Sequence, residues 1–354
     1  MKNNIFNVLF LFLSMSIMFS CNNKQEVAQS NNIEIDISDS TNDFYDNVKT
    51  SVFTMPEIEI SGEILKTVKV DFTKLKQHSL IVKETILTNG NDSFTGAFQY
   101  SGFSLHDILN NVKLDKKNKD EFRPIVDLYV EILNDKNEKV RVSWGEIYYP
   151  TDLHKIIIAT SVRRIVPSKT KELWELPTES KLIVANDLLT ERNISNPTKI
   201  IVKSYQKSFE VKRHRKTLYS PSVDIFYKNE KLKTIYSKPI ELDSHVINTI
   251  FYGRGRGIHS TLPFTGFYLK DILIKDFPFS KTALKKGLVI IASVDGYRAV
   301  FTYSEIFNRN DQSETLMMYR PQSKHGGKFR LFPSSDFFSD RAIKAVSEIH
   351  FLME

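Results

Sequence analysis

The chain has 354 residues, and its 49 Lys and Arg residues against 42 Asp and Glu residues give a net charge of +7 at neutral pH. A single cysteine excludes a disulfide bond within the chain. Because acidic residues are interspersed with the basic ones over most of the sequence, we expect no nucleic-acid partner. The excess positive charge suits anionic lipid headgroups or an anionic small molecule better.

Residues 1–20 are typical of a bacterial lipoprotein signal peptide. Lys2 is followed by an apolar run that is too short for a comfortable membrane span, and Ser20 stands directly before Cys21. We therefore expect Cys21 to be lipidated and to anchor the protein to a membrane of the bacterial cell envelope, facing the periplasm or the surface. The alternatives are an uncleaved signal anchor and a chance cysteine behind an apolar leader.

The segment after the leader is polar and rich in Asn, Ser and Asp. Such a composition cannot bury enough apolar surface to fold alone. We predict a flexible tether over residues 21–55, which would place a soluble body at some distance from the membrane.

Beyond the tether, strand signals dominate. Short β-branched runs, several of them alternating, occur at residues 58–60, 68–70, 80–82, 128–132 and 140–142. Helical signals are short. Leu105, Ile108 and Leu109 fall on one face of a helix that Ser104 can cap.

The chain repeats itself. Residues 101–109 read SGFSLHDIL and residues 265–273 read TGFYLKDIL. A second set recurs with one shift of 149 positions: Asp187, Arg192, Ile194 and Ile200 match Asp336, Arg341, Ile343 and Ile349. This pattern predicts two copies of one α+β domain with a mainly antiparallel sheet and short helices. We place the copies at residues 56–205 and 206–354.

The paired charges at the end of each copy have a structural interpretation. An Asp five residues before an Arg, at the start of a final strand, favours a turn cap and ion pair over a catalytic pair. Glu146 and Glu305 share a position that starts a short helix, where a carboxylate is favoured.

Several of these segments resemble one known family. The order Gly-Phe-x-Leu-x-Asp-Ile-Leu, Asp-Gly-Tyr-Arg-Ala-Val at 295–300, Ser-Glu-Ile at 304–306 and the closing segment 327–336 is similar to the sulfite-oxidase-like, molybdopterin-binding oxidoreductase domain. The likeness covers most of residues 221–354 and, more weakly, 57–205. It implies two tandem copies of that fold, with molybdopterin as the cofactor and an oxidoreductase activity.

The chain departs from that family at its metal ligand. The family binds molybdenum through a cysteine upstream of the Gly-x-x-Leu helix, but the equivalent segments 86–91 and 250–255 hold no cysteine. Thr88 and Tyr252 offer no thiolate there. We therefore expect no catalytic residue and no resident cofactor. The alternative is an active molybdopterin-dependent oxidoreductase whose metal lacks a protein sulfur.

A ligand site is indicated by the segment 252–259, YGRGRGIH. Its glycines allow close backbone approach, and Arg254, Arg256 and His259 offer donors to an anion. By the resemblance, the loop with His325 and Lys328 faces the same cleft. The competing interpretation is a flexible basic turn.

The eight histidines are scattered, without a His-x-x-x-His pair, so we expect no metal site. The resulting hypothesis is a non-catalytic envelope lipoprotein that binds an anionic small molecule or an envelope protein. A purely structural envelope protein with empty clefts is a further alternative.

Overall fold

The computed structural model describes residues 49–167, 169–210 and 217–353. The leader, Cys21 and most of the predicted tether lie outside the described residues, as does part of the predicted boundary between the two copies. The last part of the predicted tether includes β1 (Ser51–Val52), which pairs antiparallel with β8.

One sheet of the first half contains one parallel pair of strands among antiparallel pairs. Its order is β3 (Val68–Lys69), β2 (Glu59–Gly62), β10 (Pro197–Ser204), β6 (Leu128–Asn134) and β7 (Lys139–Ser143). The second half repeats this order with β12 (Glu230–Ile235), β11 (Val223–Tyr227), β21 (Val346–Leu352), β17 (Leu288–Ser293) and β18 (Arg298–Thr302). In both halves the final long strand pairs parallel with an early strand and antiparallel with the first strand of a hairpin.

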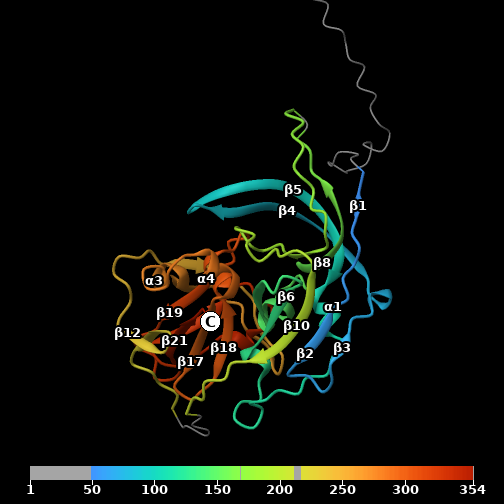
Figure 1. The fold of residues 1–354 in the computed structure, drawn as a ribbon. Helices are drawn as coiled ribbons and strands as arrows, with labels where there is room; N and C mark the ends of the chain where they lie inside the picture. The colour runs from blue at the N-terminus through green and yellow to red at the C-terminus, as the bar shows by residue number, and fades with distance from the viewer. Residues whose placement is uncertain (1–48, 168, 211–216, 354) are drawn as a thin grey trace, which may run out of the picture. The chain divides into compact units, whose positions relative to one another are not determined.

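Each half also contributes a second sheet. In the first half its order is β1, β8 (Ile156–Arg164), β5 (Asn91–Ser104) and β4 (Gln77–Thr88), and β9 (Lys181–Val184) pairs with β8. In the second half the order is β13 (His245–Ile247), β16 (Phe264–Tyr268), β19 (Thr315–Tyr319) and β20 (Phe329–Pro333). The strands β14 (Phe251–Gly253) and β15 (Gly257–Ser260) form a separate two-stranded sheet. Figure 1 shows that β4 and β5 form the longest hairpin.

The helices of the described residues are short, and four of the five begin directly after a strand. They are α1 (Leu105–Leu109), α2 (Trp144–Tyr148), α3 (Leu269–Leu273), α4 (Lys281–Lys286) and α5 (Tyr303–Phe307), with 3₁₀ turns at Phe72–Lys74, Ile125–Asp127 and Ser339–Arg341. The cap predicted for α1 is confirmed, since the Ser104 hydroxyl accepts a hydrogen bond from the Asp107 amide at 3.1 Å. The apolar face of α1 is buried as predicted.

The predicted fold class is wrong. The chain is mostly β, with 43% strand and 12% helix, and its four larger sheets lie in a ring, a propeller-like arrangement rather than a two-domain sulfite-oxidase fold. The physical reason lies in helix length. Helices of five or six residues are too short to cover a sheet as a layer, and in the two largest apolar cores their buried residues only supplement those of the strands. The recurring Gly-Phe-x-Leu-x-Asp-Ile-Leu pattern encodes only the turn from a strand into such a helix.

The shared glycine of this pattern has a steric cause. A Cβ at Gly102 would lie 2.1 Å from the carbonyl oxygen of Ile158, and one at Gly266 would lie 2.8 Å from that of Met317. Both glycines therefore let the strand that precedes the helix approach its neighbour in the sheet.

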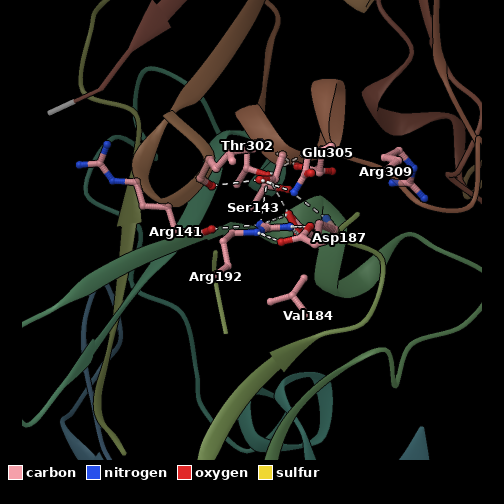
Figure 2. A network of polar contacts seen from close by, with 12 residues as sticks. Arg141, Ser143, Val184, Asp187, Arg192, Thr302, Glu305 and Arg309 are labelled. Carbon is pink, nitrogen blue, oxygen red and sulfur yellow. Dashed lines mark hydrogen bonds and ion pairs between the residues drawn. The ribbon is translucent and has the colours of Figure 1, made fainter. Parts of the chain in front are cut away.

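The two halves meet through a buried polar network, part of which Figure 2 shows. The Arg192 guanidinium donates to both oxygens of Asp187, at 2.8 and 2.6 Å, and pairs with Glu146 at 2.6 Å. It also crosses to the second half, donating to the Thr302 hydroxyl at 3.2 Å. Thr302 caps α5 and donates to Glu146 at 3.0 Å.

Arg341 makes the reciprocal set of contacts. It donates to both oxygens of Asp336 at 2.8 and 2.6 Å and to Glu305 at 2.7 Å, and it crosses to the Ser143 hydroxyl at 3.2 Å. Ser143 caps α2, as Thr302 caps α5. The ion pairs predicted for the Asp and Arg residues are confirmed. Each arginine thus bonds to the residue that caps a helix of the other half. These crossed contacts make the two halves one packed unit within the described residues.

Candidate functional site

Three segments that are distant in sequence meet at one edge of the first half. In the sheet order β8–β5–β4, His78 near the start of β4 pairs with Gly102 of β5, just before α1 begins. Helix α1 carries His106 and Asp107, and His154 lies in the turn that leads into β8. Because β5 runs between β4 and β8, its end brings α1 between the two flanking histidines.

His78, Asp107 and His154 have the arrangement of a metal-ligand set. Each offers one ligand atom, and the three atoms lie within 4.8 Å of one another. His78 Nε2 is 3.0 Å and His154 Nδ1 is 3.8 Å from the same oxygen, Oδ2 of Asp107. The rings of His78 and His154 are stacked, with centroids 3.7 Å apart and planes 8° apart. Within the described part of the chain, it is the one set of histidine, cysteine or carboxylate side chains with the arrangement of metal ligands.

The neighbouring side chains hold Asp107 and His154 in place. The second oxygen of Asp107, Oδ1, lies 3.0 Å from His106 Nδ1, and the His106 ring packs against Tyr148 with centroids 5.0 Å apart. The Ser104 hydroxyl, which caps α1, lies 3.2 Å from His154 Nδ1. Support of this kind, from groups that do not ligate, orients the ligands of protein metal sites.

The electrostatics of the cluster favour a charged Asp107 carboxylate and a neutral His154 imidazole. Burial raises the pKa of Asp107, but hydrogen bonds with His106, His78 and Ser104 lower it below its usual value. Burial lowers the pKa of His154, and the neighbouring His78 lowers it further. Transition metals bind these two protonation states. The side chains remain 24% exposed for His78 and Asp107 and 38% for His154, so an ion can reach them from solvent.

A cleft of about 540 Å³ opens beside the cluster. His78 and His154 form part of its wall, and the rest comes mainly from β4, from the turn before β8 and from residues near β9. Its lining residues are His78, Ser79, Leu80, Ile81, Asp152, His154, Lys155, Ala185, Asn186 and Asn310. Asn310 belongs to the second half, so both halves contribute to the wall.

The equivalent place in the second half is built differently. His245 pairs with Gly266 as His78 pairs with Gly102, so the two histidines occupy matching positions. The His245 ring stacks on Tyr268, with centroids 3.8 Å apart and planes 3° apart. Tyr268 stands at the position of Ser104 and gives α3 no side-chain cap.

Lysine replaces the helix histidine in the second half. Lys270 stands where α1 has His106, and its ammonium pairs with Glu314 at 2.5 Å. The second half keeps two of the three cluster positions, as His245 and Asp271, but within the described residues no third ligand completes a set there. The second half is therefore an internal control for the first-half cluster.

The glycine–arginine segment forms the turn between β14 and β15. Arg254 donates to Asp340 at 2.9 and 2.5 Å and lies over the Tyr149 ring. Arg256 and His259 are exposed. The His259 ring lies 5.6 Å from that of Phe251.

The second predicted loop makes contacts of its own. His325 is exposed, and its carbonyl oxygen accepts from Arg330 and Ser323. The Lys328 backbone amide donates to Ser220. Within the described residues, no hydrogen bond, ion pair or cleft joins these two residues to Arg254, Arg256 or His259, and none of the five lines the cleft beside the histidine cluster.

The described residues do not fit molybdopterin at the place that the resemblance implies. The equivalent segments 86–91 and 250–255 carry no thiolate, and the arginine best placed to hold a phosphate, Arg254, is already paired with Asp340. We therefore derive no chemistry through that cofactor.

Sequence reasoning missed His78, His106, Asp107 and His154 because a search for close His spacing cannot find ligands from three segments. One signal was present, since SGFSLHDIL has histidine where TGFYLKDIL has lysine. The described residues contain no helix of the length and apolarity needed to cross a membrane. No protein-family model matches the chain, and no curated protein matches it.

Proposed function

We propose that this protein binds a divalent first-row transition-metal ion through His78, Asp107 and His154. The observation that carries the proposal is the convergence of three ligand atoms within 4.8 Å of one another, at a solvent-accessible cleft that two of the three residues, His78 and His154, help to line. Imidazole and carboxylate suit zinc and iron, whereas calcium and magnesium prefer oxygen ligands alone. Zinc is the probe with which we frame the tests.

Three protein ligands would leave a coordination position open. Structural zinc sites are closed by four protein ligands, whereas sites that bind water or substrate use three. His106 lies outside the set and would act by orienting Asp107 through their 3.0 Å contact. The arrangement therefore supports a metal that meets an exogenous ligand in the cleft rather than one that only stabilises the fold.

We place this activity in an exported lipoprotein with Cys21 as its lipid anchor. The support is the leader and its serine–cysteine junction. Metabolic labelling with a radioactive fatty acid tests this part: label should enter the wild type and be absent from Cys21→Ser. Equal labelling of both proteins would contradict it.

Isothermal titration of metal-free protein with Zn²⁺ tests the metal site. We expect one equivalent to bind, binding to be lost in His154→Gln, and the matched variant His245→Gln in the second half to bind as the wild type does. Retention of affinity in His154→Gln, or equal loss in both variants, would refute the proposal.

A further inference from the structure

Lys155 lines the cleft beside the histidine cluster. Within the described residues, its ammonium has no hydrogen bond or ion pair. Its influence is visible on Asp311. Burial raises the pKa of that carboxyl, but Arg309 lowers it strongly and Lys155 adds to the lowering. Charged side chains that line a cleft without a partner are available to a ligand.

The charge of the cleft depends on the metal. Asp107 and Asp152 supply two negative charges, and Asp152 already accepts a hydrogen bond from the His154 amide at 3.0 Å. Without a metal, these outweigh Lys155. A divalent ion reverses the balance and leaves one net positive charge, which favours an anionic ligand.

Asn310 and Asn186 line another part of the cleft, and hydrogen bonds hold Asn310 in place. The Asn310 side chain donates to the carbonyl oxygens of Ala185 and Asp187, at 2.6 and 3.2 Å, and the Asn310 backbone N–H donates to the Asn186 carbonyl oxygen at 2.9 Å. These bonds fix the segment that carries Asn186. The Asn186 side chain also lines the cleft and has no partner within the described residues.

We infer that the ligand of this cleft is a small oxyanion, a carboxylate or a phosphate ester, that binds the metal with one oxygen and Lys155 with another. This inference rests on the proposed metal site. A volume of about 540 Å³ lies within the usual range for small-molecule clefts. Leu80 and Ile81 of β4 supply apolar surface for the rest of such a molecule.

The test uses the protein loaded with one equivalent of Co²⁺, whose visible spectrum reports changes at the open position. Acetate and inorganic phosphate are titrated separately. We expect at least one of them to change the spectrum saturably, and the one that binds more tightly identifies the class. Lys155→Met should bind Co²⁺ normally and weaken anion binding roughly tenfold, as expected for a lost charge-assisted contact.

Lys83→Met is the control, because Lys83 is exposed on β4, a strand that contributes to the cleft wall, but does not itself line the cleft. It should bind the anion as the wild type does. Failure of the wild type to bind Co²⁺ would overturn both the metal site and this inference. Normal Co²⁺ binding with no anion response, or with equal anion affinity in Lys155→Met, would overturn the inference alone and leave the metal site standing.

Discussion

His78 and His154 stack face to face against one carboxylate oxygen of Asp107, although His78 lies in β4 and His154 in the turn before β8. Two stacked imidazole rings gain little from each other, whereas a shared metal ion would explain why both face the same oxygen. In the second half, His245 has an aromatic ring in place of the second imidazole. If the first half binds a metal ion and the second half does not, matched variants of the two halves should behave differently. A purely structural role predicts no such difference.

The first prediction concerns stability. Zn²⁺ at 100 times its dissociation constant should stabilise the native state by about 2.7 kcal/mol, since the unfolded chain lacks the site. The rise in melting temperature, measured with Zn²⁺ against EDTA, should be absent in Asp107→Asn. His245→Gln should keep it. A rise of equal size in Asp107→Asn would show that the metal binds elsewhere.

The second prediction separates a ligand from a residue that positions one. His106→Phe keeps a ring against Tyr148 but removes the contact with Asp107 Oδ1. Loss of such support typically weakens metal affinity by about 10- to 100-fold. A competition titration with a chromophoric chelator measures this. An affinity equal to that of the wild type would mean that Asp107 is oriented by other contacts.

The third prediction concerns the network between the halves. Gly145 lies in α2, and a Cβ there would approach the Arg341 guanidinium to 2.3 Å. Displacing Arg341 would leave Asp336 and Glu305 buried without their partner, and breaking a buried ion pair costs about 3–5 kcal/mol. Gly145→Ala should therefore lower the free energy of unfolding in denaturant by an amount near that range.

Gly255→Ala is the matched control, because a Cβ at Gly255 meets no atom within 4 Å. It should leave the denaturation midpoint nearly unchanged. If the two variants unfold at the same denaturant concentration, the close packing of Arg341 on α2 does not contribute to stability.

The fourth prediction is a pH dependence. Burial raises the pKa of Glu131, but its contacts with Lys203 and Arg141 lower it below the usual value. A depressed carboxylate stabilises the fold above its unfolded-state pKa, and this contribution disappears as the pH falls through the folded-state value. The free energy of unfolding should fall less steeply with acidification in Glu131→Gln than in the wild type. Parallel pH profiles would contradict this assignment.

Much of the local structure follows from the sequence. The β-branched runs became strands, and the Ser104 cap and the Asp187–Arg192 pair formed as predicted. These features depend on neighbours in sequence, which explains why the pattern reveals them. The fold class failed because it depends on how sheets pack across the chain, and single-turn helices look the same in an α+β layer and in a mostly β structure.

The sequence did not reveal the histidine cluster for a related reason. His78, Asp107 and His154 meet only because β5 lies between β4 and β8, and that strand order is a non-local property. Arg254 looked available in the sequence, but its partner Asp340 comes from a distant segment. Only the exchange of histidine for lysine between the two copies of the LHDIL pattern carried a local signal.

X-ray absorption at the zinc edge, on protein loaded with one equivalent of Zn²⁺, shows whether His78, Asp107 and His154 hold the ion. We expect nitrogen and oxygen ligands at about 2.0–2.2 Å, with scattering from two imidazole rings that falls to one in His154→Gln. A zinc spectrum without imidazole scattering, or one that is the same in His154→Gln, would contradict the proposed site.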